Sequence, residues 1–158
     1  MHASWISLGG LGLAWLLLGS PATADMSGPA PEPAGKAPPS RLSAAEQEFN
    51  RGVVAQQEKQ WAKAAAAFQS AVRMNPRYAE AWNGLGFALR NQGKYPDSIK
   101  AYDEALRLRP DFAEALEYLG EAYVRVRRID DARQVLERLK PLDPKRAAEL
   151  ADVIEKGK

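Results

Sequence analysis

The sequence predicts an all-α protein in which three pairs of helices stack on one another and a last helix covers the end. Three observations predict this fold. Residue types repeat every 34 positions over residues 45–146. Within each unit, apolar residues recur at the spacing of successive helix turns. Glycine and proline stand where these helices would end or begin. A period of this length is typical of a solenoid, whose units pack only on their neighbours.

The 34-residue period runs through five registers without an insertion. These registers hold Gly52, Gly86 and Gly120; Pro76, Pro110 and Pro144; Phe68, Tyr102 and Leu136; Ala71, Ala105 and Leu139; and Trp61, Tyr95 and Ile129. A further register is kept only in part, because Arg51 stands where the later units have Leu85 and Leu119. The agreement of five registers over three units identifies a true repeat.

The middle unit shows why each repeat is expected to be a pair of helices. Apolar residues of its first helix, over residues 79–91, follow the i, i+3, i+4, i+7 pattern: Ala81, Trp82, Leu85, Ala88 and Leu89. Gly93 is expected to end this helix in the left-handed backbone conformation. The second helix is expected to begin near Pro96, where a missing N–H costs nothing, and to stop before Pro110.

The residues from Trp82 to Pro110 read W-x-x-L-G-x-x-L…Y…S-x-x-x-Y-x-x-A…P. This pattern closely resembles the tetratricopeptide repeat (TPR), with Ser98 in place of the usual small alanine. The resemblance implies a right-handed α–α solenoid of three TPR hairpins, with repeats at 45–78, 79–112 and 113–146. The outer repeats depart from the pattern at Glu48, Ala55, Arg127 and Pro141, and Pro141 is expected to end the last hairpin near Lys140.

Both ends of the repeat array carry helix signals. Ser43 and Glu46 have the spacing of a capping box, which starts the first helix. Asp143 and Pro144 predict a final helix over 144–156. Its apolar face consists of Ala147, Leu150, Ala151, Val153 and Ile154. Such a helix is expected to cap the array, as terminal elements of solenoids do, and a partner-binding helix is the alternative.

Composition excludes several chemistries. Among 158 residues there is no cysteine, and the single histidine is residue 2. Thiol nucleophiles, disulfides, zinc sites with cysteine ligands and imidazole acid–base catalysis are therefore excluded. The 22 Lys+Arg nearly balance the 20 Asp+Glu, which gives no general electrostatic case for nucleic acid. We expect a protein that is not an enzyme and uses no cofactor or metal.

The N-terminal region differs in composition from the repeats. Residues 6–19 are uncharged and mostly apolar, and Ala22-Thr23-Ala24 resembles a signal-peptidase site. These features predict a signal peptide over 1–24, export to the periplasm of a Gram-negative host, and no membrane span after cleavage. The alternative is an uncleaved anchor, although the apolar run would span only about 21 Å of a roughly 30 Å hydrocarbon core. Residues 25–42, rich in proline and alanine, are expected to form a disordered linker ahead of the repeat domain at 43–158.

In a tetratricopeptide array the first helix of each hairpin lines a concave groove. The candidate partner-binding residues at groove positions are Phe49, Asn50, Val53, Asn83, Phe87, Arg90, Asn91, Glu117, Tyr118, Glu121 and Arg125. Aromatic residues on the polar side of amphipathic helices are typical of binding surfaces. Carboxamides can donate to and accept from the backbone of an extended peptide. The alternative is that Phe49 and Phe87 simply close over their neighbours inside the groove.

One known use of this groove has no support in the sequence. Some members of the family grip the C-terminal carboxylates of heat-shock chaperones with a clamp of Lys, Asn and Arg. The matching positions here hold Phe49, Val53, Gly84, Glu114 and Tyr118. We therefore expect a scaffold that binds a different protein or peptide partner, of unknown identity, in a bacterial envelope assembly. The alternative is a structural subunit that self-associates through the ends of its array.

Overall fold

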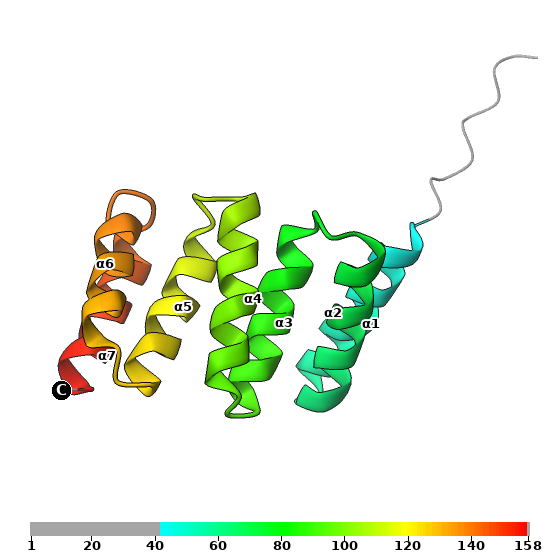
Figure 1. The fold of residues 1–158 in the computed structure, drawn as a ribbon, viewed down its shortest axis with the longest axis horizontal. Coiled ribbons are helices and arrows are strands. Elements are labelled where there is room, and N and C mark those ends of the chain that lie inside the picture. Colours follow the sequence, from blue (N-terminus) through cyan, green and yellow to red (C-terminus); the bar gives the residue numbers. More distant parts are fainter. Residues whose placement is uncertain (1–41, 158) are drawn as a thin grey trace, which may run out of the picture. The chain divides into compact units, whose positions relative to one another are not determined.

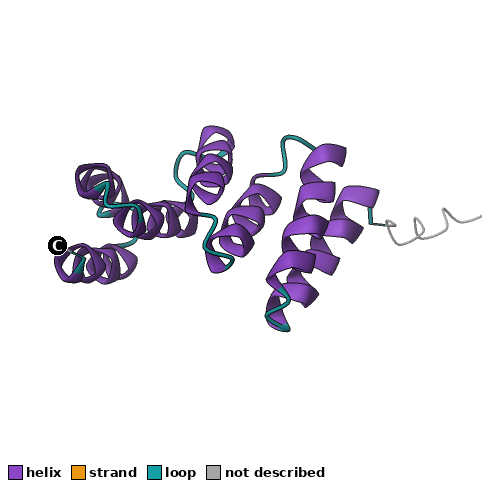
Figure 2. Cartoon of the chain, turned by 60° about the horizontal axis from the view of Figure 1, so that its bottom comes forward, coloured by secondary structure: helices purple, strands orange, loops and turns teal. Residues whose placement is uncertain are grey.

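The computed structural model describes residues 42–157. The predicted signal peptide over 1–24, and the linker up to residue 41, lie outside the described residues. The described part of the chain forms helices and short connections without a strand (Figure 2). The helices are α1 (Ala44–Gln57), α2 (Trp61–Met74), α3 (Ala79–Asn91), α4 (Tyr95–Leu108), α5 (Ala113–Arg125), α6 (Ile129–Leu139) and α7 (Pro144–Lys156). The all-α prediction is confirmed.

Successive helices pack side by side in chain order (Figure 1). The pairs α1/α2, α3/α4 and α5/α6 form the three hairpins, and α2 and α4 join each hairpin to the first helix of the next. The first helices also contact one another, α1 with α3 and α3 with α5. The last helix, α7, packs against both α5 and α6 and closes this end of the array, as expected for a capping helix.

The helix ends follow the predicted local signals. Ser43 accepts a hydrogen bond from the Glu46 backbone N–H, and the Glu46 carboxylate accepts one from the Ser43 N–H at 2.7 Å, which completes the capping box. The Ser43 hydroxyl also donates to the Glu46 carboxylate, at 2.8 Å, and this bond, together with the one from the Ser43 N–H, holds the pKa of Glu46 below its usual value. The Asp143 side chain accepts from the Arg146 N–H at the start of α7. Helix α6 ends at Leu139, as Pro141 predicts.

The turn inside each hairpin has a residue in the left-handed backbone conformation at the same position of the repeat. Gly93 has φ +75°, as predicted from its place after the helix. Lys59 and Arg127, in the same register of the outer repeats, have φ 57° and 64°. A side chain in this conformation costs roughly 1 kcal/mol or more, so the turn geometry is imposed by packing of the hairpin. Arg127 is also tied to the C-terminus, because its Nη1 donates to the Gly157 carbonyl at 3.0 Å.

In the first two repeats, a large aromatic side chain of the second helix fills the hairpin core beside the repeated glycine. Phe68 is almost fully buried, and a Cβ added at Gly52 or Gly84 would come within 2.8 Å of its ring. Tyr102 fills the same role in the second repeat, where a Cβ at Gly86 would lie 2.6 Å from its ring. Gly52 and Gly86 are therefore required by the aromatic rings that face them, whereas Gly120 faces Leu150 of the capping helix α7, where an added Cβ would come within 2.5 Å of the side chain. Among the described residues, no helix combines the length and apolar character needed to cross a membrane.

Candidate partner-binding groove

Helices α1, α3 and α5 place eight of the candidate residues around two hollows. The first, here called the aromatic hollow, measures about 180 Å³ and is lined by Phe49, Val53, Gln56, Phe68, Glu80, Asn83, Gly84, Phe87, Phe112 and Glu114. The second, the arginine hollow, measures about 320 Å³ and is lined by Arg90, Asn91, Tyr95, Glu121, Arg125 and Val153. The groove therefore has an aromatic part and a charged part.

The aromatic candidates are both packed and partly exposed. The Phe49 ring lies 5.6 Å from that of Phe68 and 5.0 Å from that of Tyr78. The Phe87 ring lies 5.9 Å from that of Trp61 and 5.1 Å from that of Tyr118. Phe49, Phe87 and Tyr118 are each half-buried. The rings thus close over their neighbours and still present an apolar surface to the groove.

Arg90 joins the two parts of the groove. Its guanidinium lies 5.1 Å from the centre of the Phe87 ring and 4.7 Å from that of Tyr118. The same guanidinium forms an ion pair with Glu121 on α5. Burial raises the pKa of the Tyr118 hydroxyl, and the neighbouring Glu114 carboxylate raises it further. Arg90 is therefore engaged within the chain, and it fixes the position of the rings around it.

Asn83 and its neighbours form the floor of the aromatic hollow. Asn83 is only 7% exposed, and its Oδ1 accepts no hydrogen bond. Glu80 lies one helix turn away, and its carboxylate pairs with Nη1 of Arg109 at 2.8 Å. The Arg109 guanidinium in turn lies 3.5 Å from the centre of the Phe112 ring. Phe112 is absent from the predicted site, although its register also holds Tyr78, which packs on Phe49.

Two candidate residues are not available in the groove. Glu117 is 5% exposed, and its carboxylate accepts a hydrogen bond from Nη1 of Arg146 on the capping helix. Burial raises the pKa of Glu117, and the Arg146 guanidinium opposes that shift. Asn50 is exposed on another face of α1, where it lines a separate hollow. Asn91 stays exposed, and its Nδ2 donates to the Phe87 carbonyl at 2.8 Å.

A family model described as tetratricopeptide repeat matches residues 49–98 and 87–147. The chain belongs to the tetratricopeptide repeat family. The TPR domain of Arabidopsis OM64 is a similar solved structure, with a TM-score of 0.69 and 20% sequence identity; the match covers 73% of this chain and 97% of that one. The TPR2B domain of yeast Sti1, in complex with pHsp70, is also similar, with a TM-score of 0.67 and 20% identity over 72% of this chain and 94% of that one. The first TPR of Spaghetti (RPAP3), bound to the HSP90 peptide SRMEEVD, has a TM-score of 0.67 and 16% identity over 71% of this chain and 91% of that one. No curated protein sequence matches.

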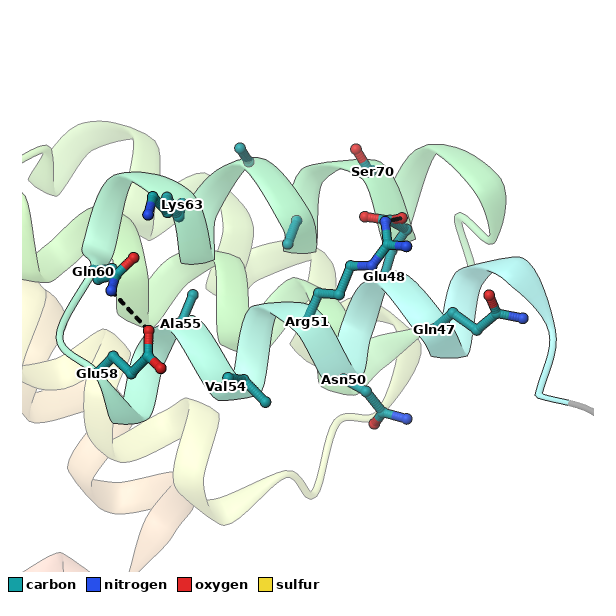
Figure 3. Close-up of a pocket in the computed structure, with 12 residues that line it drawn as sticks. Gln47, Glu48, Asn50, Arg51, Val54, Ala55, Glu58, Gln60, Lys63 and Ser70 are labelled. Carbon is teal, nitrogen blue, oxygen red and sulfur yellow. Dashed lines mark hydrogen bonds and ion pairs between the residues drawn. The ribbon is translucent and has the colours of Figure 1, made fainter.

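A further hollow of the described TPR array, of about 710 Å³, lies at its N-terminal end on α1 and α2 (Figure 3). Its α1 residues Gln47, Glu48, Arg51, Val54 and Ala55 stand 34 positions before Ala81, Trp82, Leu85, Ala88 and Leu89. The latter are residues through which α3 packs on the first hairpin. This hollow is therefore the outer stacking face of the first repeat, and we call it the end face.

Polar substitutions cover only part of the end face. Glu48 and Arg51 replace a tryptophan and a leucine of the second repeat, and their side chains form an ion pair at 2.5 Å. At the other end of α1, Gln60 donates to Glu58 at 2.7 Å (Figure 3). Val54 between them remains 54% exposed. No group of Asp, Glu or His within residues 42–157 is arranged to hold a metal ion.

Proposed function

We propose that the chain is a non-catalytic scaffold that binds a segment of a partner protein in the groove of α1, α3 and α5. The aromatic hollow carries this proposal. It combines half-buried rings with a buried amide whose Oδ1 has no partner, and concave sites of this composition are typical of recognition surfaces. The similar Sti1 and RPAP3 domains are described in complexes with pHsp70 and with an HSP90 peptide, which supports binding of a partner segment as the use of this domain.

A groove variant and a matched variant on the outer surface test this function. Phe87→Ala removes a ring of α3 that lines the aromatic hollow and packs on Tyr118 of α5, and it should abolish capture of the partner from an envelope extract. Arg107→Ala, at an exposed site of α4, should leave capture unchanged. Thermal unfolding measured by circular dichroism checks that both variants fold. Equal capture by the two folded variants would show that the groove is not the binding site.

We propose that this scaffold acts in the bacterial envelope. Support comes from the apolar run over residues 6–19 and the small residues before position 25. The intact mass of the exported protein measures cleavage directly. The mass of a chain that begins at Asp25 supports export with removal of the signal peptide. The mass of the full-length chain, found in the membrane fraction, supports the anchored alternative.

The end face favours self-association as a second candidate function. Its apolar part, with Val54 at the centre, is exposed, whereas α7 covers the opposite end of the array. An assembly that uses one such face on each copy closes as a two-fold dimer and does not grow into a filament. Size-exclusion chromatography with light scattering should then show a dimer that Val54→Glu converts to a monomer. A monomer at every concentration of the unmodified protein would exclude this function.

A further inference from the structure

The arginine hollow lies where two of the groove helices end. Arg90 stands in the last turn of α3, and Arg125 stands in the last turn of α5. Basic side chains are favoured there because the carbonyls at a helix C-terminus carry a partial negative charge. Both residues line the same hollow of about 320 Å³, so two arginine side chains meet at this end of the groove.

Only one of these two arginines has a carboxylate partner. Among the described residues that line the arginine hollow, Glu121 is the only acid, and it forms its ion pair with Arg90. Arg125 is exposed, and within residues 42–157 its side chain has neither an ion pair nor a hydrogen bond. The hollow therefore presents a guanidinium whose N–H donors can be reached by a bound molecule.

A second basic hollow adjoins the arginine hollow. This C-terminal hollow measures about 410 Å³ and shares Arg125 and Val153 with the first. Its other lining residues include two cations, of which Arg127 donates to an uncharged backbone carbonyl and Lys156 pairs with Asp152. The described residues that line the two hollows thus hold four basic side chains and one acidic side chain. This excess of positive charge favours an anionic group.

The lining of both hollows suits a carboxylate on an aliphatic stem. Val153, on the capping helix, is half-buried and lines both hollows beside Arg125. It offers an apolar surface on which methylene groups can pack. A guanidinium binds a carboxylate through two parallel N–H donors, and these charge-assisted bonds are stronger than neutral ones. Glutamate and aspartate side chains combine the two features.

We propose that the arginine hollow binds a glutamate or aspartate side chain of the partner segment through the guanidinium of Arg125. This inference rests on the proposed groove function and adds a charge preference to it. The site differs from the carboxylate clamp of relatives, whose positions on α5 are Glu114 and Tyr118, whereas Arg125 is the last residue of that helix.

The distance between the two hollows of the groove predicts a spacing in the partner. Phe87 lines the aromatic hollow, and Arg90, which lies over its ring, lines the arginine hollow. The residues of α3 and α5 that line the two hollows lie about 8–14 Å apart along the helices, which an extended segment spans in about three or four residues. We expect the acidic residue at that separation from the apolar residue that fills the aromatic hollow.

The test needs no knowledge of the partner. The ¹⁵N-labelled full chain is titrated at constant ionic strength with N-acetyl-glutamate amide, whose only charge is the side-chain carboxylate, and with N-acetyl-glutamine amide as an uncharged probe of the same shape. The glutamate probe should shift the side-chain Nε–H resonance of Arg125 and the backbone resonance of Val153, and the glutamine probe should bind about tenfold more weakly. Equal binding of both probes, or glutamate-dependent shifts that avoid the hollow, would overturn the proposal.

A third probe distinguishes a side chain from a chain terminus. N-acetyl-alanine carries its only charge on a terminal carboxylate, and we expect it to bind no more tightly than the glutamate probe. Tighter binding of N-acetyl-alanine would assign the hollow to the C-terminus of a partner and would contradict the proposal.

Two matched variants test the role of Arg125. Arg125→Gln should weaken binding of the glutamate probe about tenfold. Arg77→Gln is the control, because Arg77 is also exposed and has no ion pair within residues 42–157, and this variant should leave probe binding unchanged. Thermal unfolding measured by circular dichroism checks that both variants fold.

The same variants separate this inference from the groove function. If Phe87→Ala abolishes partner capture but Arg125→Gln changes neither capture nor probe binding, the groove binds its partner without an anionic side chain and the inference is wrong. If Phe87→Ala leaves capture unchanged, the groove function itself fails, whereas probe binding that still depends on Arg125 would retain the anion site alone.

Discussion

The hydroxyl of Tyr102 offers a sharp test of how the repeat core is packed. Tyr102 is fully buried against Gly86, and its hydroxyl oxygen has no hydrogen-bond partner. A buried polar group without a partner costs about 1–3 kcal/mol. Tyr102→Phe removes that group while the ring remains, so we expect the free energy of unfolding to rise by about 1–2 kcal/mol. Phe68, in the same register of the first repeat, already fills its site without a hydroxyl.

The assay is equilibrium urea unfolding followed by circular dichroism, with thermal unfolding as a second measure. For a domain of this size the gain corresponds to a rise in Tm of roughly 4 °C per kcal/mol. Tyr95→Phe, at a half-buried site, is the matched control and should change stability by less than about 0.5 kcal/mol. A loss of stability in Tyr102→Phe would show that the hydroxyl is hydrogen-bonded, and would refute the reasoning.

The same residue predicts a difference in alkaline stability. Burial raises the pKa of Tyr102 well above its usual value of 10.0. Below the unfolded-state pKa, the Tyr102 hydroxyl is neutral in both states and the pH does not affect stability through it. Above that pKa, the hydroxyl loses its proton in the unfolded state but keeps it in the folded state, so the free energy of unfolding of the unmodified protein falls as the pH rises. Tyr102→Phe has no hydroxyl and therefore does not show this loss. Its stability advantage over the unmodified protein should therefore widen above about pH 10.

Two further substitutions test other contacts by urea unfolding. Gly86→Ala would place a Cβ 2.6 Å from the buried Tyr102 ring, so we expect a loss of about 1–3 kcal/mol, and an unchanged midpoint would show that the ring moves freely. Arg146→Met leaves the buried Glu117 carboxylate without its cationic partner, which should cost about 2–3 kcal/mol. Because burial already raises the pKa of Glu117, this variant should lose stability more steeply as the pH rises above 4.5, and adding Glu117→Gln should flatten that dependence.

The helices and their ends were predictable because their signals are local or strictly periodic. The capping box at Ser43, the left-handed Gly93 and the end of α6 before Pro141 each depend on residues within one or two turns. The left-handed conformation of Lys59 and Arg127 has no such signal, since neither residue favours it and only the packing of the hairpin imposes it.

The sequence could predict which face of the helices carries the candidate site, but not which residues of that face are available to a partner. Helical periodicity places Asn50 beside Phe49, but the array turns that edge of α1 toward the end face. Glu117 occupies a groove register, and its partner Arg146 lies at the start of the capping helix α7, in the register of Tyr78 and Phe112. The aromatic residues of that register in the earlier repeats give no indication of an ion pair there. The bridging role of Arg90 likewise depends on the distance between neighbouring hairpins. Contacts between repeats therefore decide which groove residues are available.

The unequal ends of the array set the direction in which it can be lengthened by design. A hairpin grafted before Ser43 would meet a face that differs from an internal one mainly at Gln47, Glu48 and Arg51. A hairpin grafted after α6 would have to displace α7, and the buried carboxylate of Glu117 would then lose its ion pair with Arg146. New repeats are therefore more readily added at the N-terminal end, where they would extend the groove beyond α1.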